Sequence, residues 1–272
     1  MTVAWRWAKL VVAVGIATLG AGAAMASDPG YLPDKSIEAD LGYSVPPPPD
    51  NKSEMGRLDL AMVEMAQTRD PAAYDEAYRD AGAYSFDRLI GRFSPAAGTE
   101  LSVETSPILA HILKLVLNDT GAYASLAKNA GPRARPYVEN PDIVPCATDY
   151  LRASDGRSYP SGHSTNGYAA ALVLAEVMPA RASKLLARGI RYGDNRVVCG
   201  VHHPIDVQQG RLLAIAIFAK LKLDPAFRED VACARQAYDR SLAGTEARKP
   251  LDPSCAALDA KYRAELKLPT KP

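Results

Sequence analysis

Residues 158–164 of the chain read SYPSGHS, and this stretch decides which fold and chemistry the sequence can support. Pro160 restricts the backbone before the turn, and Gly162 lets the backbone approach a ligand closely. Ser161 stands where an N-cap residue belongs, so a helix should begin directly after it. The first N–H groups of that helix favour an anion, and His163 would lie beside that anion. An ordinary N-cap serine followed by a structural histidine would explain the same letters.

A second polar segment follows at residues 193–206, which read GDNRVVCGVHHPID. Pro204 favours a helix start, and His202 and Asp206 would then share one helix face, because they are four residues apart. A carboxylate on one ring nitrogen fixes the tautomer and leaves the other nitrogen with a free lone pair. Asp206 could equally cap this helix while His202 is a solvated loop residue. His203 is expected to be a bystander at the rim of any site.

A third segment lies upstream and supplies positive charge in the pattern K-x6-R-P, formed by Lys128 and Arg135-Pro136. Arginine can bind phosphate oxygens through two N–H groups, and lysine acts as a point charge. Arg133 would be a spare cation, and Arg196 adds a third one downstream. Because most Lys and Arg side chains are solvated, this segment alone indicates nothing. In combination, the three segments hold what is needed to bind a phosphoryl group and transfer it through a histidine.

Length, composition and charge limit the class of protein. The chain has 272 residues, of which 47% are hydrophobic, enough for one sizeable core. Its 32 Lys and Arg residues nearly balance 31 Asp and Glu residues, which gives no sign of a nucleic-acid partner or a basic membrane-binding surface.

The first 26 residues read as a secretory signal peptide. Arg6 and Lys9 precede an apolar stretch at residues 10–24, and Ala24-Met25-Ala26 is a cleavage site of the A-x-A type. An uncleaved membrane anchor is the alternative, but the apolar run is short for a span, and no later segment is apolar for long enough to cross a bilayer. Cleavage would change the formal net charge from +1 to −1.

Four cysteines follow the signal peptide, an even number that suggests disulfides in an oxidising compartment. Four cysteines allow three pairings, of which we expect Cys146–Cys199 and Cys233–Cys255. The first bond would tie the loop before Ser161 to the loop before His202. No C-x-x-C and no Cys/His cluster is present in the sequence, so a zinc site is not expected.

The rest of the chain predicts one all-α domain over residues 53–272, preceded by a Pro-rich arm at residues 27–52. Runs of alternating β-branched residues are missing almost everywhere, and helix signals dominate. His111 lies in an amphipathic segment and is expected to be structural. Capping signals predict helix starts after Ser53, at Pro71, near Tyr84, at Pro107, at Thr120, after Ser161, and at Pro179, Pro204, Pro225 and Pro253.

The three polar segments resemble the three-part signature of the type 2 phosphatidic acid phosphatase superfamily. More closely, the chain resembles the class A bacterial nonspecific acid phosphatases, which fit the Ser158-Tyr159 lead-in, the Val198-Cys199-Gly200 stretch and the arm containing Pro46-Pro47-Pro48-Pro49. The resemblance implies a helical fold of the kind shared with vanadium haloperoxidases. It also implies a periplasmic, metal-independent enzyme without a cofactor, a small phosphomonoester as substrate, and often a homo-oligomer.

The resemblance also implies a role for each site residue. His202 would attack phosphorus to form a phosphohistidine, and Asp206 would orient it. His163 would protonate the leaving alcohol and then activate water, so His202 should start neutral and His163 charged. The phosphate oxygens would be held by Lys128, Arg135, Ser161, Gly162 and Arg196.

Two positions depart from the family pattern. Asn195 precedes Arg196 where serine is usual, and it could still donate a hydrogen bond to phosphate. Gly131-Pro132 stand in a segment that often carries an aromatic residue. Alternative interpretations are a vanadate-dependent haloperoxidase that uses the same oxyanion site, a lipid phosphatase, and a phosphate-binding protein without activity. The short chain and Tyr159 favour the phosphatase over the haloperoxidase.

Overall fold

The structure is a computed structural model that describes residues 30–32, 45–67, 70–82, 85–146, 157–242 and 249–268. The predicted signal peptide, residues 1–26, lies outside these ranges, as does most of the predicted arm. Within them the chain is all-α, as predicted, and its one β-type pairing is an isolated bridge between Arg133 and Arg157. The helices are α2 (Glu54–Ala66), α3 (Pro71–Ala81), α4 (Phe86–Gly91), α5 (Ser94–Ala97), α6 (Pro107–Ala130), α7 (Pro136–Glu139), α8 (Gly162–Val177), η2 (Pro179–Arg181), α9 (Ala182–Val198), α10 (Pro204–Leu221), α11 (Pro225–Leu242) and α12 (Pro253–Glu265).

Most helices begin where their capping residues predict. The side chains of Ser53, Asp70 and Ser161 each accept a hydrogen bond from a backbone N–H in the first turn of α2, α3 and α8. These bonds satisfy N–H groups that have no partner inside the helix. Proline follows at the first helical position of several others, including α6 and α10.

The prediction of a separate helix starting at Thr120 is wrong. Helix α6 continues without a break from Pro107 to Ala130 and ends at Gly131. Thr120 is buried inside it, and its hydroxyl donates to Asn166 Oδ1 of α8 at 2.7 Å. The polar residue therefore pairs with a neighbouring helix and does not start a new one. The short helices α5 and α7 were not predicted.

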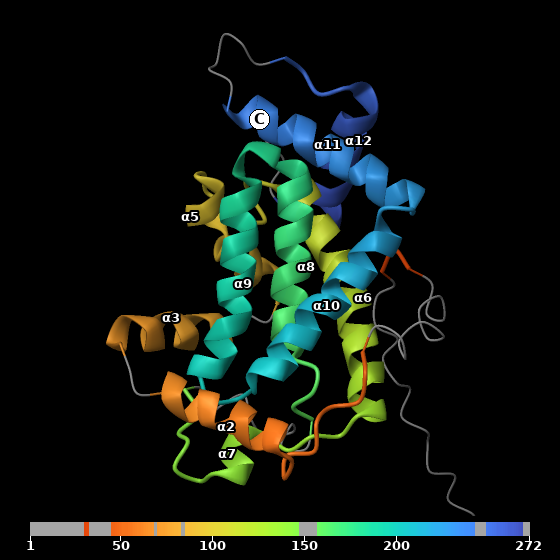
Figure 1. Ribbon diagram of the computed structural model, residues 1–272. Helices are drawn as coiled ribbons and strands as arrows, with labels where there is room; N and C mark the ends of the chain where they lie inside the picture. Colours follow the sequence, from red (N-terminus) through yellow and green to blue (C-terminus); the bar gives the residue numbers. More distant parts are fainter. Residues whose placement is uncertain are drawn as a thin grey trace, which may run out of the picture.

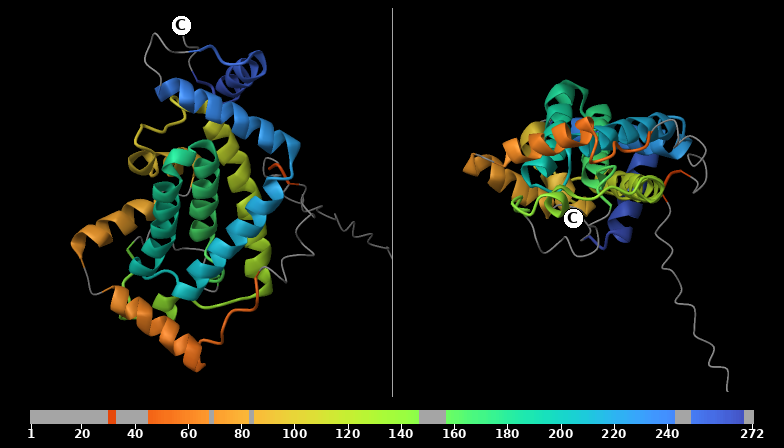
Figure 2. Two further views of the ribbon diagram at one scale, coloured as in Figure 1. Left: turned by 45° about the horizontal axis from the view of Figure 1, so that its top comes forward. Right: turned by 60° about the horizontal axis from the view of Figure 1, so that its bottom comes forward.

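Helix α8 forms the centre of the core, with α6, α9 and α10 packed around it (Figures 1 and 2). Small residues allow the close approach: a Cβ on Gly167 of α8 would lie 2.2 Å from the Tyr192 ring of α9. Helices α11 and α12 cover one end of this bundle, while α2, α3 and α7 lie at the other (Figure 1). In the part of the chain that the structure describes, every helix is too short or too polar to cross a bilayer.

Both predicted disulfides are confirmed. Cys146 and Cys199 join the loop after α7 to the end of α9, and Cys233 and Cys255 join α11 to α12. The first bond is reinforced by a backbone hydrogen bond of 3.0 Å from Cys146 N to Cys199 O. It therefore fixes the loop that leads into His202.

Two helix-interior glycines make a matched test of this packing. A Cβ on Gly210 of α10 would lie 2.6 Å from the Ser161 carbonyl oxygen, whereas a Cβ on Gly121 of α6 would meet nothing within 4 Å. We expect Gly210→Ala to lower the free energy of unfolding by about 1–3 kcal/mol through overpacking. Gly121→Ala should raise it by about 0.5–1 kcal/mol, because alanine is the better helix former. Urea denaturation followed by circular dichroism measures both, and equal effects of the two substitutions would contradict the close packing.

Candidate active site

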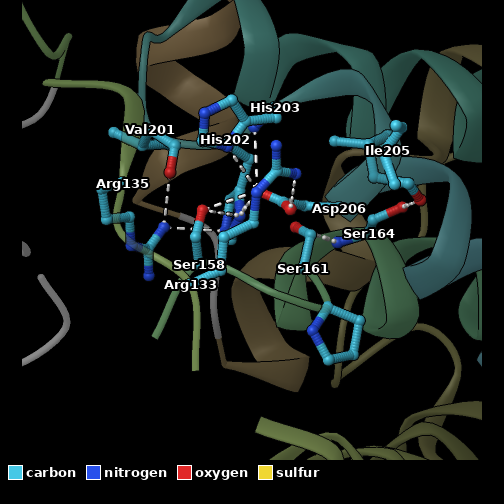
Figure 3. A network of polar contacts seen from close by, with 12 residues as sticks. Arg133, Arg135, Ser158, Ser161, Ser164, Val201, His202, His203, Ile205 and Asp206 are labelled. Atoms are coloured by element: carbon cyan, nitrogen blue, oxygen red, sulfur yellow. Dashed lines mark hydrogen bonds and ion pairs between the residues drawn. The ribbon is translucent and has the colours of Figure 1, made fainter. Parts of the chain in front are cut away.

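The three polar segments meet where α8 and α10 begin and α9 ends (Figure 3). Ser161 N donates to the Asp206 carbonyl oxygen at 2.9 Å, and Ser158 N donates to the Arg133 carbonyl oxygen at 3.0 Å. Because Gly210 has no side chain, the first turn of α8 can lie directly against α10. Residues distant in the sequence thus form one buried polar cluster.

His202 is held between a carboxylate and a guanidinium (Figure 3). Its Nδ1 lies 3.4 Å from Asp206 Oδ2, and its Nε2 lies 2.8 Å from Arg135 Nη1. Arg135 also donates to the Val201 carbonyl oxygen at 2.6 Å. A guanidinium can only donate, so Nε2 carries the lone pair and Nδ1 carries the proton that faces Asp206.

The Asp206 carboxylate is fully buried and has four other donors around it. Oδ1 lies 2.7 Å from Arg133 Nη1, and Oδ2 accepts from Ser158 Oγ at 2.6 Å and from His203 N at 2.9 Å. His203 Nδ1 lies 3.2 Å from the same oxygen. Burial alone would raise the pKa of Asp206, but hydrogen bonds from His202 and His203 and the charge of Arg133 hold it well below its usual value. Asp206 is therefore ionised.

Two expectations from the sequence are wrong. Arg133 is not a spare cation: it is buried, and its Nη1 lies 2.8 Å from Asp59 Oδ2 as well as 2.7 Å from Asp206. His203 is not at the rim: it is fully buried, with Nε2 3.0 Å from Glu139 Oε1 of α7. Asp59 and Glu139 were missed because their partners lie far away in the sequence.

Arg196 carries the clearest sign of an anion site. Its side chain is buried, and Nε and Nη1 have no hydrogen-bond partner among the described residues. Burial lowers the pKa of Arg196 to about 10, so it remains a cation at neutral pH. Buried donors are almost always satisfied, and a planar guanidinium suits phosphate oxygens.

Lys128, like Arg196, lies near enough to His163 to lower the pKa of its ring, but its ammonium group already has partners. Its Nζ donates to the carbonyl oxygens of Arg157 at 2.8 Å and Pro160 at 2.5 Å, with Ser158 O at 3.4 Å. The lysine therefore fixes the backbone that leads into α8. Burial, followed by the charge of Arg135, lowers the pKa of Lys128 to about 7.

His163 lies in the first turn of α8 and is only partly exposed. Its Nε2 is 3.2 Å from the Ala81 carbonyl oxygen of α3. Burial, followed by the charge of Arg196, holds the pKa of His163 well below its usual value, and burial and Arg135 do the same for His202. The expectation of a charged His163 therefore requires a bound dianion, whose negative charge would raise this pKa.

Asn195, which stands where the family usually has serine, pairs with a residue of α3. It is buried, and its Nδ2 donates to Asp80 Oδ2 of α3 at 2.7 Å. One of its two amide N–H groups is therefore engaged by another helix, and donation to phosphate by the other stays a prediction. In the described ranges, no group of three or more His, Cys, Asp or Glu side chains is arranged to hold a metal ion.

Comparison with known proteins identifies the family of the chain. Residues 106–228 match the PAP2 superfamily. The chain is 34% identical to an acid phosphatase of Zymomonas mobilis, over 79% of this chain and 80% of that protein. It is 34% identical to a non-specific acid phosphatase of Salmonella typhimurium, over 76% of this chain and 83% of the relative, and 32% identical to one of Providencia stuartii, over 71% and 79%. The chain therefore belongs to the PAP2 superfamily and, within it, to the class A bacterial nonspecific acid phosphatases, which are phosphoric monoester hydrolases.

Proposed function

We propose that the chain hydrolyses small phosphate monoesters of broad range through a phosphohistidine on His202, without a metal ion. The observation that carries the proposal is the environment of His202 Nε2. This nitrogen holds a lone pair, lies 2.8 Å from the Arg135 guanidinium, and belongs to a ring whose other nitrogen faces an ionised carboxylate. A buried, neutral imidazole beside cations suits attack on a phosphoryl group, because the cations stabilise the phosphate oxygens.

In the first step, Arg135 would transfer its hydrogen bond from His202 Nε2 to a phosphate oxygen. The freed Nε2 lone pair would form a bond to phosphorus while the bond from phosphorus to the ester oxygen breaks. The leaving oxygen would take a proton from His163, which gives the free alcohol. In the second step, water would give a proton to His163 and attack phosphorus, and the bond from phosphorus to Nε2 would break. Since Nε2 of His163 faces the Ala81 carbonyl, its Nδ1 would exchange the proton.

The cations would supply most of the stabilisation in both steps. Arg196 offers two donors with no partner among the described residues. In addition to burial, the charges of Arg196, Arg135 and Lys128 each lower the pKa of His163, so all three cations lie near this histidine. The Ser161 hydroxyl and the Gly162 N–H at the start of α8 would add further donors. Each well-placed donor contributes about 3 kcal/mol to the stabilisation of such a transition state. Charge that a metal would otherwise supply can thus come from side chains.

The relatives favour the phosphatase over the haloperoxidase alternative, because those at 32–34% identity are named acid phosphatases. We further infer that the chain acts in the periplasm. The two disulfides support this inference, since such bonds persist in oxidising compartments. A homo-oligomer stays a prediction.

Replacement of the nucleophile tests the mechanism. We expect His202→Ala to lower kcat/KM by roughly four orders of magnitude or more and to abolish the phosphoenzyme. The phosphoenzyme can be measured by labelling with ³²P-phosphate ester and quenching in alkali, because phosphohistidine is labile in acid. His111→Ala is the matched control, since His111 stacks on Tyr262 with ring centroids 3.6 Å apart, outside the site. A phosphoenzyme in the His202 variant would refute the assignment.

Chelation tests metal independence. Dialysis of the purified protein against EDTA should leave the rate of p-nitrophenyl phosphate hydrolysis unchanged, because the side chains supply the positive charge. Loss of activity that added zinc or magnesium restores would show that a metal takes part in the reaction.

The pKa of Lys128 predicts how oxyanion binding depends on pH. Below about pH 7 the side chain is an ammonium that attracts an anion, and above it the charge is lost. The inhibition constant of sulfate, which stays a dianion, should therefore rise roughly tenfold at alkaline pH. Bound sulfate raises this pKa, so the change should be centred above pH 7. In Lys128→Arg the constant should stay level, because arginine keeps its charge. A level profile in the unaltered protein would contradict the assignment.

A further inference from the structure

Asp80 is a buried carboxylate that belongs to none of the three signature segments. It lies at the end of α3, is 1% exposed, and faces two donors from α9. Arg188 Nη2 is 2.6 Å from Oδ1, and Asn195 Nδ2 is 2.7 Å from Oδ2. Arg188 and Asn195 are seven residues apart, so both lie on one face of α9. Asp80 therefore joins the end of α3 to the helix that carries Arg196.

The next residue along the chain touches the proposed acid. The Ala81 carbonyl oxygen lies 3.2 Å from His163 Nε2, and a carbonyl can only accept. His163 must therefore carry its proton on Nε2 in the neutral form, which leaves Nδ1 to exchange a proton with the substrate. An acceptor on one ring nitrogen fixes the orientation and tautomer of an imidazole, as the carboxylate does for His202.

The same cluster also includes a ring that stacks on His163. The Tyr192 ring lies 6.1 Å from the His163 ring, measured between centroids, at an interplanar angle of 25°. The Arg188 guanidinium lies 5.5 Å from the centre of the Tyr192 ring and 5.8 Å from that of Phe93. Asp80 is therefore connected to His163 by two sets of contacts. One runs through the backbone of Ala81, and the other runs through Arg188 and the Tyr192 ring.

We propose that Asp80 is a positioning residue for protonation of the leaving group, which it assists by holding the Ala81 carbonyl and the Tyr192 ring against His163. The proposal rests on the proposed acid role of His163. Asn195 would help to hold the Asp80 carboxylate in place, because it is the second donor to it after Arg188. Asn195, which stands where the family usually has serine, would thus join α9 to α3 through its bond to Asp80.

The test compares substrates that differ in their need for a proton. p-Nitrophenolate leaves without protonation, whereas the alkoxide of an alkyl phosphate such as glycerol phosphate requires it. The variant is Asp80→Asn, which has the same shape but turns an amide N–H toward one of two donors. We expect kcat/KM to fall about tenfold more for glycerol phosphate than for p-nitrophenyl phosphate, because general acid catalysis is worth about 10²–10⁴-fold in all. In Asp80→Glu, which keeps a carboxylate, the extra loss of kcat/KM for glycerol phosphate should be smaller than in Asp80→Asn.

Asp230→Asn is the matched control. Asp230 of α11 is also buried and also accepts two hydrogen bonds, from Tyr31 Oη at 2.6 Å and Tyr262 Oη at 2.8 Å. Its helix lies at the end of the bundle away from α3 (Figure 1). The control should change kcat/KM for both substrates by the same factor. If Asp80→Asn also lowered kcat/KM for both substrates by the same factor, Asp80 would have a purely structural role and the inference would be overturned.

His163→Ala separates failure of this inference from failure of the proposed function. If His163→Ala discriminates between the two substrates and Asp80→Asn does not, only the role of Asp80 is overturned. If His163→Ala affects both substrates equally, His163 is not the general acid, and the proposed role of Asp80 is overturned as well. Should Asp80→Asn not fold, Asn195→Ala removes one of the two donors and should show the same selectivity on a smaller scale. A uniform effect there would overturn the inference.

Discussion

The buried charge of Asp206 is the constraint on which the rest of the site depends. An ionised carboxylate without water costs several kcal/mol unless donors surround it. Here the donors come from separate parts of the chain: Arg133 before α7, Ser158 before α8, and His202 and His203 before α10. Satisfying one carboxylate therefore requires these segments to converge. The geometry of the site is a consequence of removing that charge from water.

The cations of the site divide into two groups by their partners. Arg133 lies between the carboxylates of Asp59 and Asp206, so its charge is largely cancelled. Arg196, in contrast, keeps two donors without a partner among the described residues, and Arg135 lies against the His202 imidazole and the Val201 carbonyl oxygen. The first group stabilises the fold and the second leaves an excess of positive potential. An anion that binds the second group would stabilise the folded protein, because it binds only that state.

Local chemistry could be predicted from the sequence wherever the interacting groups are close in the chain. The caps at Ser53, Asp70 and Ser161 bond to backbone groups two or three residues away, so the helix starts followed from the residue types. The pairing of His202 with Asp206 also follows from a spacing of four. The prediction of a helix start at Thr120 is wrong for the opposite reason. The partner of Thr120, Asn166, is on another helix, and no residue nearby in the sequence indicates this pairing.

The missed residues share one physical origin, which also suggests how they could be found. Buried polar groups are nearly always paired, so each polar side chain placed in the core requires a partner. The partner of Arg133 is Asp59, that of His203 is Glu139, and that of Asn195 is Asp80. Each partner lies on α2, α3 or α7, the helices at the site end of the bundle, and none belongs to the signature. These helices thus do more than cover the core, since they supply the polar partners that allow Arg133, His203 and Asn195 to be buried at the proposed active site. The signature contains the residues proposed to bind phosphate, and the buried polar residues beside them indicate that further partners must exist elsewhere in the chain.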